Sequence, residues 1–389
     1  MEVSGEHHIP VIIIGGGPIG LFLGICLSKL GIAFRIFEKR VEINPHSRSI
    51  GIHPPSLGLF ADTDILTPFL KNGLKIEYGK AFVNRDHVGT VPFRNLPCSH
   101  TFILSLPQYR TEQLLERELS KLGLELLSRD ARLQSLDVGS KQIRAHVEED
   151  GSTQTYTCDF LIGCDGKNSK VRTQAQIPFP GHAYSDTYIM GDFDDTTTFG
   201  TKAAVFLHQR GVVESFPLPK KRRRWVIKTK EYDDKPTRNT IATHLKERLD
   251  MDIADAKSYM ISSFGVQHHM AEQFVKDRII LAGDAAHVVS PIGGQGMNLG
   301  WQDAWKLSQS LDLIYNRQHP VKTTLETYQQ TQQQITRKVA RRAEWNMKLG
   351  RSFHNAFVRK SLLTLLIKTP VSNLLTRLFA MQHLDDWPV

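Results

Sequence analysis

One segment near the N-terminus limits the folds open to this chain more than any other. The uncharged, β-branched run Ile9–Ile14 is followed by the turn GGGPIG (residues 15–20) and then by an apolar stretch up to Leu30. The run is typical of a strand that is buried on both faces, and Gly20–Leu30 is typical of a buried helix. Ala33–Glu38 predicts a second strand, which completes a strand–helix–strand unit of about 30 residues. The sequence therefore predicts an α/β fold.

The turn in this unit has the spacing GxGxxG, which is typical of a dinucleotide-binding loop. The first glycine permits a tight turn, the second lets a pyrophosphate approach the backbone, and the third lets helix and strand pack closely. The N–H groups and the dipole at the start of the helix favour the anion. The predicted phosphate-binding residues are Gly15, Gly17, Pro18, Ile19 and Gly20.

A carboxylate ends the second predicted strand. Glu38 lies about 20 residues after the turn, where an acidic side chain accepts hydrogen bonds from an adenosine ribose. The same charge repels a 2′-phosphate, so the sequence favours FAD or NAD over NADP at this site. Lys39 follows directly and is a further predicted cofactor contact.

A second glycine-rich segment follows the predicted strand Arg278–Leu281. It contains GDAAH (residues 283–287) and PIGGQGMN (residues 291–298). Asp284 is placed to accept hydrogen bonds from the ribityl hydroxyls of a flavin, and the glycines expose N–H groups that face an anionic ring edge. His287 is interpreted as a packing or hydrogen-bonding residue rather than a catalytic one. The predicted cofactor contacts here are Asp284, Pro291, Gly294, Gln295, Gly296, Met297 and Asn298.

The sequence LIGCDG (residues 161–166), with Arg172 seven residues after Asp165, is the third motif. Alone, Asp-Gly indicates only a turn. In their order along the chain, the three motifs resemble those of the class A flavoprotein monooxygenases, the FAD-dependent aromatic hydroxylases of the para-hydroxybenzoate hydroxylase type. The resemblance covers roughly residues 9–310. It implies that Arg48 and Gln108 contact the flavin, and that Asp165 touches both FAD and a passing nicotinamide cofactor.

The resemblance also implies an activity. A family member binds FAD non-covalently, uses NAD(P)H as a transient co-substrate, and hydroxylates an aromatic or related small molecule with O₂ through a flavin C4a-hydroperoxide. Two alternatives stay open: a flavoprotein reductase or dehydrogenase of a lipophilic substrate that does not use oxygen, and a flavin-binding sensor or interaction protein. No side chain is predicted as catalytic, and no metal site is predicted. The substrate, the choice between NADPH and NADH, and the oligomeric state stay open.

Strand-like segments interrupt the α/β pattern and suggest two interleaved domains and a tail. The FAD-binding domain is predicted to be discontinuous, and a sheet-rich substrate domain is inserted into it. The predicted bounds are 1–75, 101–175 and 271–340 for the FAD-binding domain, 76–100 and 176–270 for the substrate domain, and 341–389 for a helical C-terminal segment.

The chain is basic, with a formal net charge of +9. Its strongest charge run, Lys220–Arg224, is expected to be an exposed hairpin turn; no nucleic-acid-binding module accompanies it, so we predict no nucleic-acid partner. The tail carries apolar helical faces within Phe357–Met381, which we expect to pack on the body rather than on a membrane surface. Four cysteines without disulfide or metal spacing are typical of a cytoplasmic protein, with peripheral membrane association as the alternative.

Overall fold

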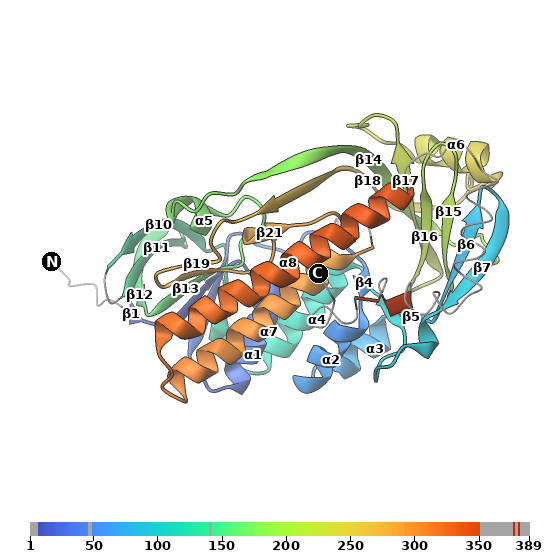
Figure 1. Cartoon of the computed structure of the whole chain (residues 1–389). Helices are drawn as coiled ribbons and strands as arrows, with labels where there is room; N and C mark the ends of the chain where they lie inside the picture. The colour runs from blue at the N-terminus through green and yellow to red at the C-terminus, as the bar shows by residue number, and fades with distance from the viewer. Residues whose placement is uncertain are drawn as a thin grey trace.

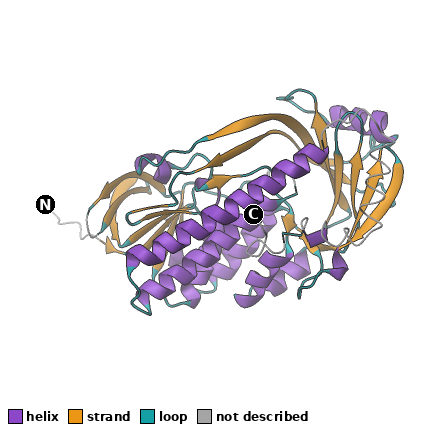
Figure 2. Cartoon of the chain, viewed as in Figure 1, coloured by secondary structure: helices purple, strands orange, loops and turns teal. Residues whose placement is uncertain are grey.

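The computed structural model confirms an α/β fold built from several sheets (Figures 1 and 2). Arg48 and most of the C-terminal segment, including the apolar faces expected on either side of Pro370, lie outside the described residues. The residues that the structure describes are 7–45, 49–139, 142–291, 293–350, 376–377 and 380–381.

A six-stranded sheet forms the centre of the part that was predicted to bind a cofactor. Its neighbours from β20 to β9 pair in parallel, and only the edge strand β19 is antiparallel. Every residue of β2 is buried, which explains its unbroken β-branched sequence. In spatial order the strands are β19 (Val275–Lys276), β20 (Ile279–Leu281), β13 (Phe160–Gly163), β2 (Val11–Ile14), β3 (Phe34–Glu38) and β9 (Leu127–Arg129).

Helices cover one face of this sheet, and a second sheet covers the other. In Figure 1 the long helix α8 lies along α7, which in turn lies beside α1. The helices are α1 (Pro18–Lys29), α2 (Pro54–Asp62), α3 (Leu66–Asn72), α4 (Gln108–Ser120), α7 (Gln295–Tyr315) and α8 (Val321–Gly350). The opposite face carries α5 (Lys170–Gln174) and a sheet with the order β1 (His7–His8), β12 (Ser152–Cys158), β11 (Ile143–Glu149) and β10 (Arg132–Val138).

A mostly antiparallel, eight-stranded sheet makes up the other end of the molecule (Figure 1). Its two longest strands, β14 and β18, pair with each other along almost their whole length and reach back towards the six-stranded sheet. In spatial order the strands are β21 (His287–Val288), β18 (Ser258–Met270), β14 (Gly181–Asp194), β17 (Arg222–Thr229), β16 (Val213–Leu218), β15 (Ala203–Leu207), β6 (Tyr78–Val83) and β7 (Asp86–Pro92). A small sheet of β4 (Gly51–Ile52), β8 (Ile103–Ser105) and β5 (Leu74–Ile76) lies between the two ends.

The eight-stranded sheet has two different faces. Alternate residues such as Ala204, Val213 and Trp225 pack against α6 (Arg238–Leu249), a helix that the sequence analysis did not predict. Their neighbours along the strands point to the opposite face, since successive side chains of a strand alternate. That opposite face looks towards the six-stranded sheet and lines a cavity.

The basic run at residues 220–224 is only in part the exposed turn that the sequence led us to expect. Lys220 and Lys221 form the exposed turn between β16 and β17, but Arg223 and Arg224 belong to β17 and are fully buried. The expectation was wrong for these two arginines because carboxylates on other parts of the sheet neutralise them. Asp195 pairs with Arg223 at 2.9 Å, and Asp192 accepts two hydrogen bonds from Arg224 at 2.6 and 2.8 Å.

Two described residues of the C-terminal segment pack on the body. Met381 is buried among Val289 and Leu299 and the α8 residues Ile335 and Val339. Ala380 is buried in a separate cluster below the small sheet. These contacts favour packing for at least this part of the tail.

Candidate functional site

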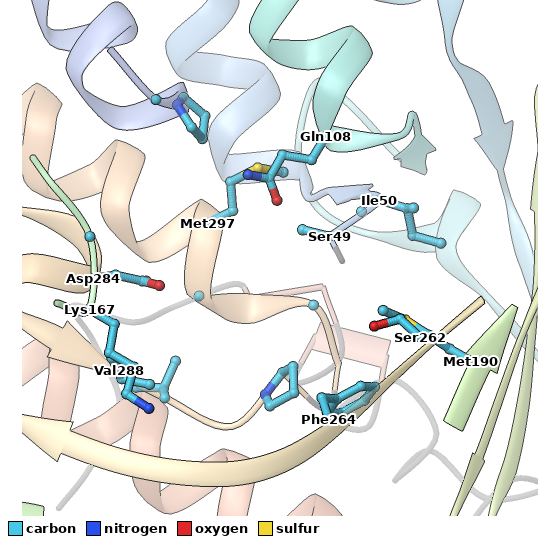
Figure 3. A pocket seen from close by; sticks show the side chains of 18 of the residues that line it. Ser49, Ile50, Gln108, Lys167, Met190, Ser262, Phe264, Asp284, Val288 and Met297 are labelled. Carbon is cyan, nitrogen blue, oxygen red and sulfur yellow. The ribbon is translucent and has the colours of Figure 1, made fainter. Parts of the chain in front are cut away.

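A single continuous cavity of about 1720 Å³ connects the glycine-rich turn after β2 with the open face of the eight-stranded sheet. Figure 3 shows Asp284 and Lys167 on one side, Met190, Ser262 and Phe264 on another, and Gln108, Ser49 and Met297 between them. Most of the residues predicted from the three motifs line it. These are Gly15, Gly17, Pro18, Ile19, Glu38, Lys39, Gln108, Asp165, Asp284, Pro291, Gly294, Gly296 and Met297.

The turn after β2 forms an open cradle. Gly15 has a φ of +111°, and a Cβ atom there would lie 2.4 Å from the carbonyl oxygen of Cys164, so only glycine fits. At Gly17 a Cβ atom would project into the cavity, where its nearest neighbour is a nitrogen of Arg40 at 4.0 Å. Gly20 does not line the cavity; a Cβ atom there would lie 2.0 Å from the oxygen of Gly15, which explains the need for glycine in the helix.

Glu38 closes one side of this cradle. One of its carboxylate oxygens accepts a hydrogen bond from the N–H of Gly16 at 2.7 Å, and the other accepts from the backbone and side chain of Arg40, both at 2.9 Å. Burial works to raise the pKa of this carboxyl, but the hydrogen bonds and charge of Arg40 outweigh it and hold the pKa below its usual value. Glu38 is therefore a fixed, ionised acceptor at the edge of the cavity.

Gln108 is held by a buried acid of its own helix. Its amide nitrogen donates to Glu112 at 2.9 Å, one turn further along α4. Glu112 lies 3.5 Å from the guanidinium of Arg40. The pKa of Glu112 is raised, chiefly by burial. The polar groups of α4 and those of the first βαβ unit thus form one connected network.

The turn that carries Asp284 is fastened from behind by a residue that the sequence analysis did not single out. Asp303 of α7 is fully buried and accepts hydrogen bonds from the N–H of Gly283 at 2.9 Å and from the side chain of Gln332 at 2.6 Å. Its carboxylate also lies 2.6 Å from Nε2 of His287. Burial lowers the pKa of His287, but the adjacent charge of Asp303 outweighs this effect and raises it. His287 is thus a buried hydrogen-bonding residue.

The third motif is pinned to the second. Arg172 donates to the carbonyl oxygens of Lys167 at 2.8 Å and Ala285 at 2.9 Å, and it lies 3.7 Å from the centre of the Phe179 ring. Asp165 lines the cavity, but one oxygen of its carboxylate accepts from two N–H groups at the start of α5. A helix-capping role therefore accompanies any contact of Asp165 with a cofactor.

Two of the predicted contacts at the start of α7 are buried away from the cavity. Asn298 accepts a hydrogen bond from the N–H of His53 at 2.8 Å and donates to the oxygens of Gly51 and Gly294, both at 2.9 Å. It therefore positions the loop instead of lining the cavity. Gln295 is also buried and does not line the cavity. His53, which no motif indicated, lines the cavity and lies 3.1 Å from the oxygen of Gly293.

The far half of the cavity is largely apolar. Its wall includes Val205, Val226, Met190 and Met260 of the eight-stranded sheet, together with Phe93 beneath the small sheet. Such a surface suits an aromatic or aliphatic molecule, while the glycine-rich half suits a phosphorylated one. One chain thus offers two adjoining sites of different chemistry.

Comparison with known proteins places the chain in a family. The family described as "FAD binding domain" matches residues 8–343. Rifampicin monooxygenase of Streptomyces venezuelae is 31% identical over 339 residues, which are 80% of this chain and 68% of that protein.

The chain belongs to the family of class A FAD-dependent monooxygenases.

Other relatives differ in how much of their length the chain covers. The "Uncharacterized aromatic compound monooxygenase YhjG" of Bacillus subtilis (strain 168) is 33% identical over 79% of this chain, but the match spans only 65% of that protein's length. The p-nitrophenol 4-monooxygenase PnpA of Pseudomonas putida DLL-E4 has the same fold, with a TM-score of 0.89 at 18% identity, 98% of this chain and all of that chain being covered. The predicted fold and the prediction of FAD as the cofactor are confirmed.

The cradle fits FAD on its own geometry. The space in front of Gly17 admits a pyrophosphate, Glu38 is an ionised acceptor for a ribose, and Asp284 is exposed to the cavity. In the part of the chain that the structure describes, no three His, Cys, Asp or Glu side chains are grouped to hold a metal ion. The same residues include no helix with the length and apolar character needed to cross a membrane.

Proposed function

We propose that this protein is a FAD-dependent monooxygenase that uses NAD(P)H and O₂ to hydroxylate an aromatic or related small molecule. The observation that carries the proposal is the single cavity, in which the cofactor cradle opens directly onto an apolar wall large enough for a ring system. The names of the monooxygenase relatives support it.

The residues proposed to hold FAD follow the glycine-rich half of the cavity. The turn at Gly15 and Gly17 takes the pyrophosphate, Glu38 the adenosine ribose, and Asp284 the ribityl chain. Pro291 and the backbone between Gly294 and Met297 lie at the flavin ring, and Gln108 faces it from α4. When bound, FAD supplies the redox chemistry, since it accepts electrons from NAD(P)H and passes one oxygen atom of O₂ to the substrate.

The chain itself contributes position, charge and exclusion of water. The N–H groups at the start of α7 face the part of the cavity proposed for the flavin ring. They can stabilise negative charge on the edge of that ring, because helix N-termini favour anions. The apolar side chains of the sheet keep water from the reacting atoms, which protects reactive species from hydrolysis. Asp303 and Asn298 act from behind, because they fix the loops that carry Asp284 and Gly294.

We further propose that the chain divides at the predicted bounds: residues 1–75, 101–175 and 271–340 bind FAD, 76–100 and 176–270 bind the substrate, and 341–389 form a C-terminal segment. The strands β6 and β7 support this division, because they join the eight-stranded sheet from the earlier of the two substrate segments. A cytoplasmic location also stays a proposal.

Oxygen consumption coupled to NAD(P)H oxidation tests the proposed function. The FAD-loaded protein is screened with phenols, quinolones, polyketides and quinone precursors, and the product mass is measured. We expect at least one compound to stimulate oxidation of NAD(P)H and to gain one oxygen atom. Stimulated oxidation of NAD(P)H without oxygen uptake favours a reductase or dehydrogenase, and no turnover with any compound favours a sensor.

A further inference from the structure

One acidic side chain stands apart in the apolar half of the cavity. Glu214 lies in the middle of β16, with Val205 of β15 directly opposite on one side and Val226 of β17 on the other. The same row continues through Met190 of β14 to Ser262 of β18. Because all of these residues line the cavity, Glu214 projects into it from within a row whose other members are aliphatic as far as Ser262.

Other acids of this sheet are neutralised, but Glu214 is not. Asp192 pairs with Arg224, Asp195 with Arg223, and Asp186 with Lys228. Within the described ranges, the carboxylate of Glu214 has neither a hydrogen bond nor an ion pair. An ionised acid in an apolar pocket is costly unless it is paired, so this position suits a ligand that donates a hydrogen bond to the carboxylate.

The charged side chains around Glu214 do not supply that group. Arg224, two residues along β17 from Val226, lines the cavity but is bound by both oxygens of Asp192. The ammonium of Lys80, on β6, lies over the ring of Phe199, which belongs to the cluster on the α6 face of the sheet. The hydroxyl of Ser262 donates to the oxygen of Ser263 at 3.3 Å.

Burial alone makes Glu214 a weaker acid than an ordinary glutamate. The apolar surroundings raise the pKa of Glu214 from 4.5 to about 7. A carboxyl with this pKa can hold or release a proton at neutral pH, which is the property needed to accept a proton from a substrate hydroxyl.

We propose that Glu214 accepts a hydrogen bond from a phenolic hydroxyl of the substrate and takes its proton. This inference rests on the proposed function and narrows the substrate class to phenols. In the step, the O–H bond of the phenol breaks, the proton moves to the carboxylate of Glu214, and the electron pair stays on the phenolate oxygen. The ring carbons ortho and para to that oxygen become richer in electrons and thus better acceptors of an electrophilic oxygen atom.

Matched pairs of ligands test the inference by binding alone. Phenol, 1-naphthol and 4-nitrophenol are titrated against the FAD-loaded protein, each beside its methyl ether, and the flavin absorbance reports the dissociation constant. For at least one pair we expect the phenol to bind about 10- to 150-fold more tightly than the ether, as for a hydrogen bond to a charged group. Glu214→Gln should abolish most of that preference.

Glu247→Gln is the control, because Glu247 is exposed on α6, on the opposite side of the same sheet, and pairs with Arg210. It should leave the preference unchanged. Where 4-nitrophenol binds, its absorbance should show the phenolate at a lower pH on the wild type than on Glu214→Gln.

The inference is overturned if none of the three phenols binds more tightly than its ether, or if the preference survives in Glu214→Gln. The proposed function is judged by a separate readout. Oxygen incorporation into an aromatic compound that lacks a hydroxyl leaves the monooxygenase standing while Glu214 loses its role. Phenol binding through Glu214 without any oxygenated product would support the role of Glu214 and contradict the monooxygenase activity.

Discussion

The guanidinium of Arg172 donates a hydrogen bond to the carbonyl oxygen of Ala285 at 2.9 Å. The first residue follows β13 and the second follows β20, so neighbouring strands of the central sheet have their C-terminal loops tied together. Ligands of open α/β sheets bind at this edge. The tie therefore holds the Asp165 loop and the Asp284 turn at a fixed separation around the cavity.

Gly17→Val should abolish FAD retention. A Cβ atom at this position would lie no closer than 4.0 Å to any neighbouring protein atom, and the valine methyl groups beyond it should fill the space of the pyrophosphate. Flavin released on denaturation is quantified by absorbance, and the far-ultraviolet circular dichroism should match the wild type. Gly58→Ala in α2, where an added Cβ has open space, is the matched control. Full flavin content in Gly17→Val would show that the turn is not the phosphate site.

Asp284→Ala should weaken FAD binding by roughly 5- to 150-fold. The ribityl hydroxyls lose a charged acceptor, and each lost hydrogen bond of this kind costs about 1–3 kcal/mol. Because the side chain is exposed to the cavity, the melting temperature of the flavin-free protein should hardly change. Titration of the flavin-free protein with FAD measures the effect; an unchanged dissociation constant contradicts the assignment.

The pair of His287 and Asp303 should make stability depend on pH. Because the folded-state pKa of His287 is raised above its ordinary 6.5, its protonated form contributes stability below that value, and the contribution is lost as pH rises through the folded pKa. We expect the free energy of unfolding of the wild type to fall relative to that of His287→Gln between about pH 6 and pH 9. Urea denaturation of both proteins across this range measures it. Parallel pH profiles of the two proteins would disprove the coupling.

Asp192→Asn should destabilise the protein strongly. The substitution leaves Arg224, which is fully buried, without its bidentate carboxylate, and breaking a buried pair costs about 3–5 kcal/mol. Lys220→Gln, in the exposed turn of the same basic run, should change stability by no more than about 0.5 kcal/mol. Chemical denaturation compares the two variants, and equal effects would mean that the run behaves as one solvated surface.

Met381→Ala should lower stability by about 2–5 kcal/mol, because it leaves a cavity between Val289 and α8. We also expect no co-sedimentation of the wild type with anionic vesicles at physiological salt. Salt-sensitive vesicle binding that is lost in the variant, at an unchanged melting temperature, would instead place this segment on a membrane.

The residues of the cofactor half of the cavity could be predicted from the sequence, because the signals that mark them are local. GGGPIG, Glu38 and Asp284 each lie next to the strand end or helix start that positions them, so spacing alone locates them. Glu214 and Asp303 were missed because their roles depend on which distant residues face them. The register of β15, β16 and β17 surrounds Glu214 with valines, and short-range pattern does not encode that register.

Other differences have equally specific causes. The sequence alone predicts a solvated basic run, because Asp192 lies 32 residues before its partner Arg224 in the chain and only the sheet brings the two together. The helix α6 did carry a signal, since Ile241, Leu245 and Leu249 recur at four-residue spacing, but the surrounding strand-like pattern masked it.

The alternation along the eight-stranded sheet has an evolutionary consequence. Positions such as 190, 205 and 226 line the cavity that is proposed to hold the substrate, while the residues between them anchor the sheet to α6. Exchange of one aliphatic side chain for another on the inner face thus reshapes the chamber while the outer face keeps its packing. Acceptance of new compounds can then drift by single substitutions, without any redesign of the scaffold that holds the flavin.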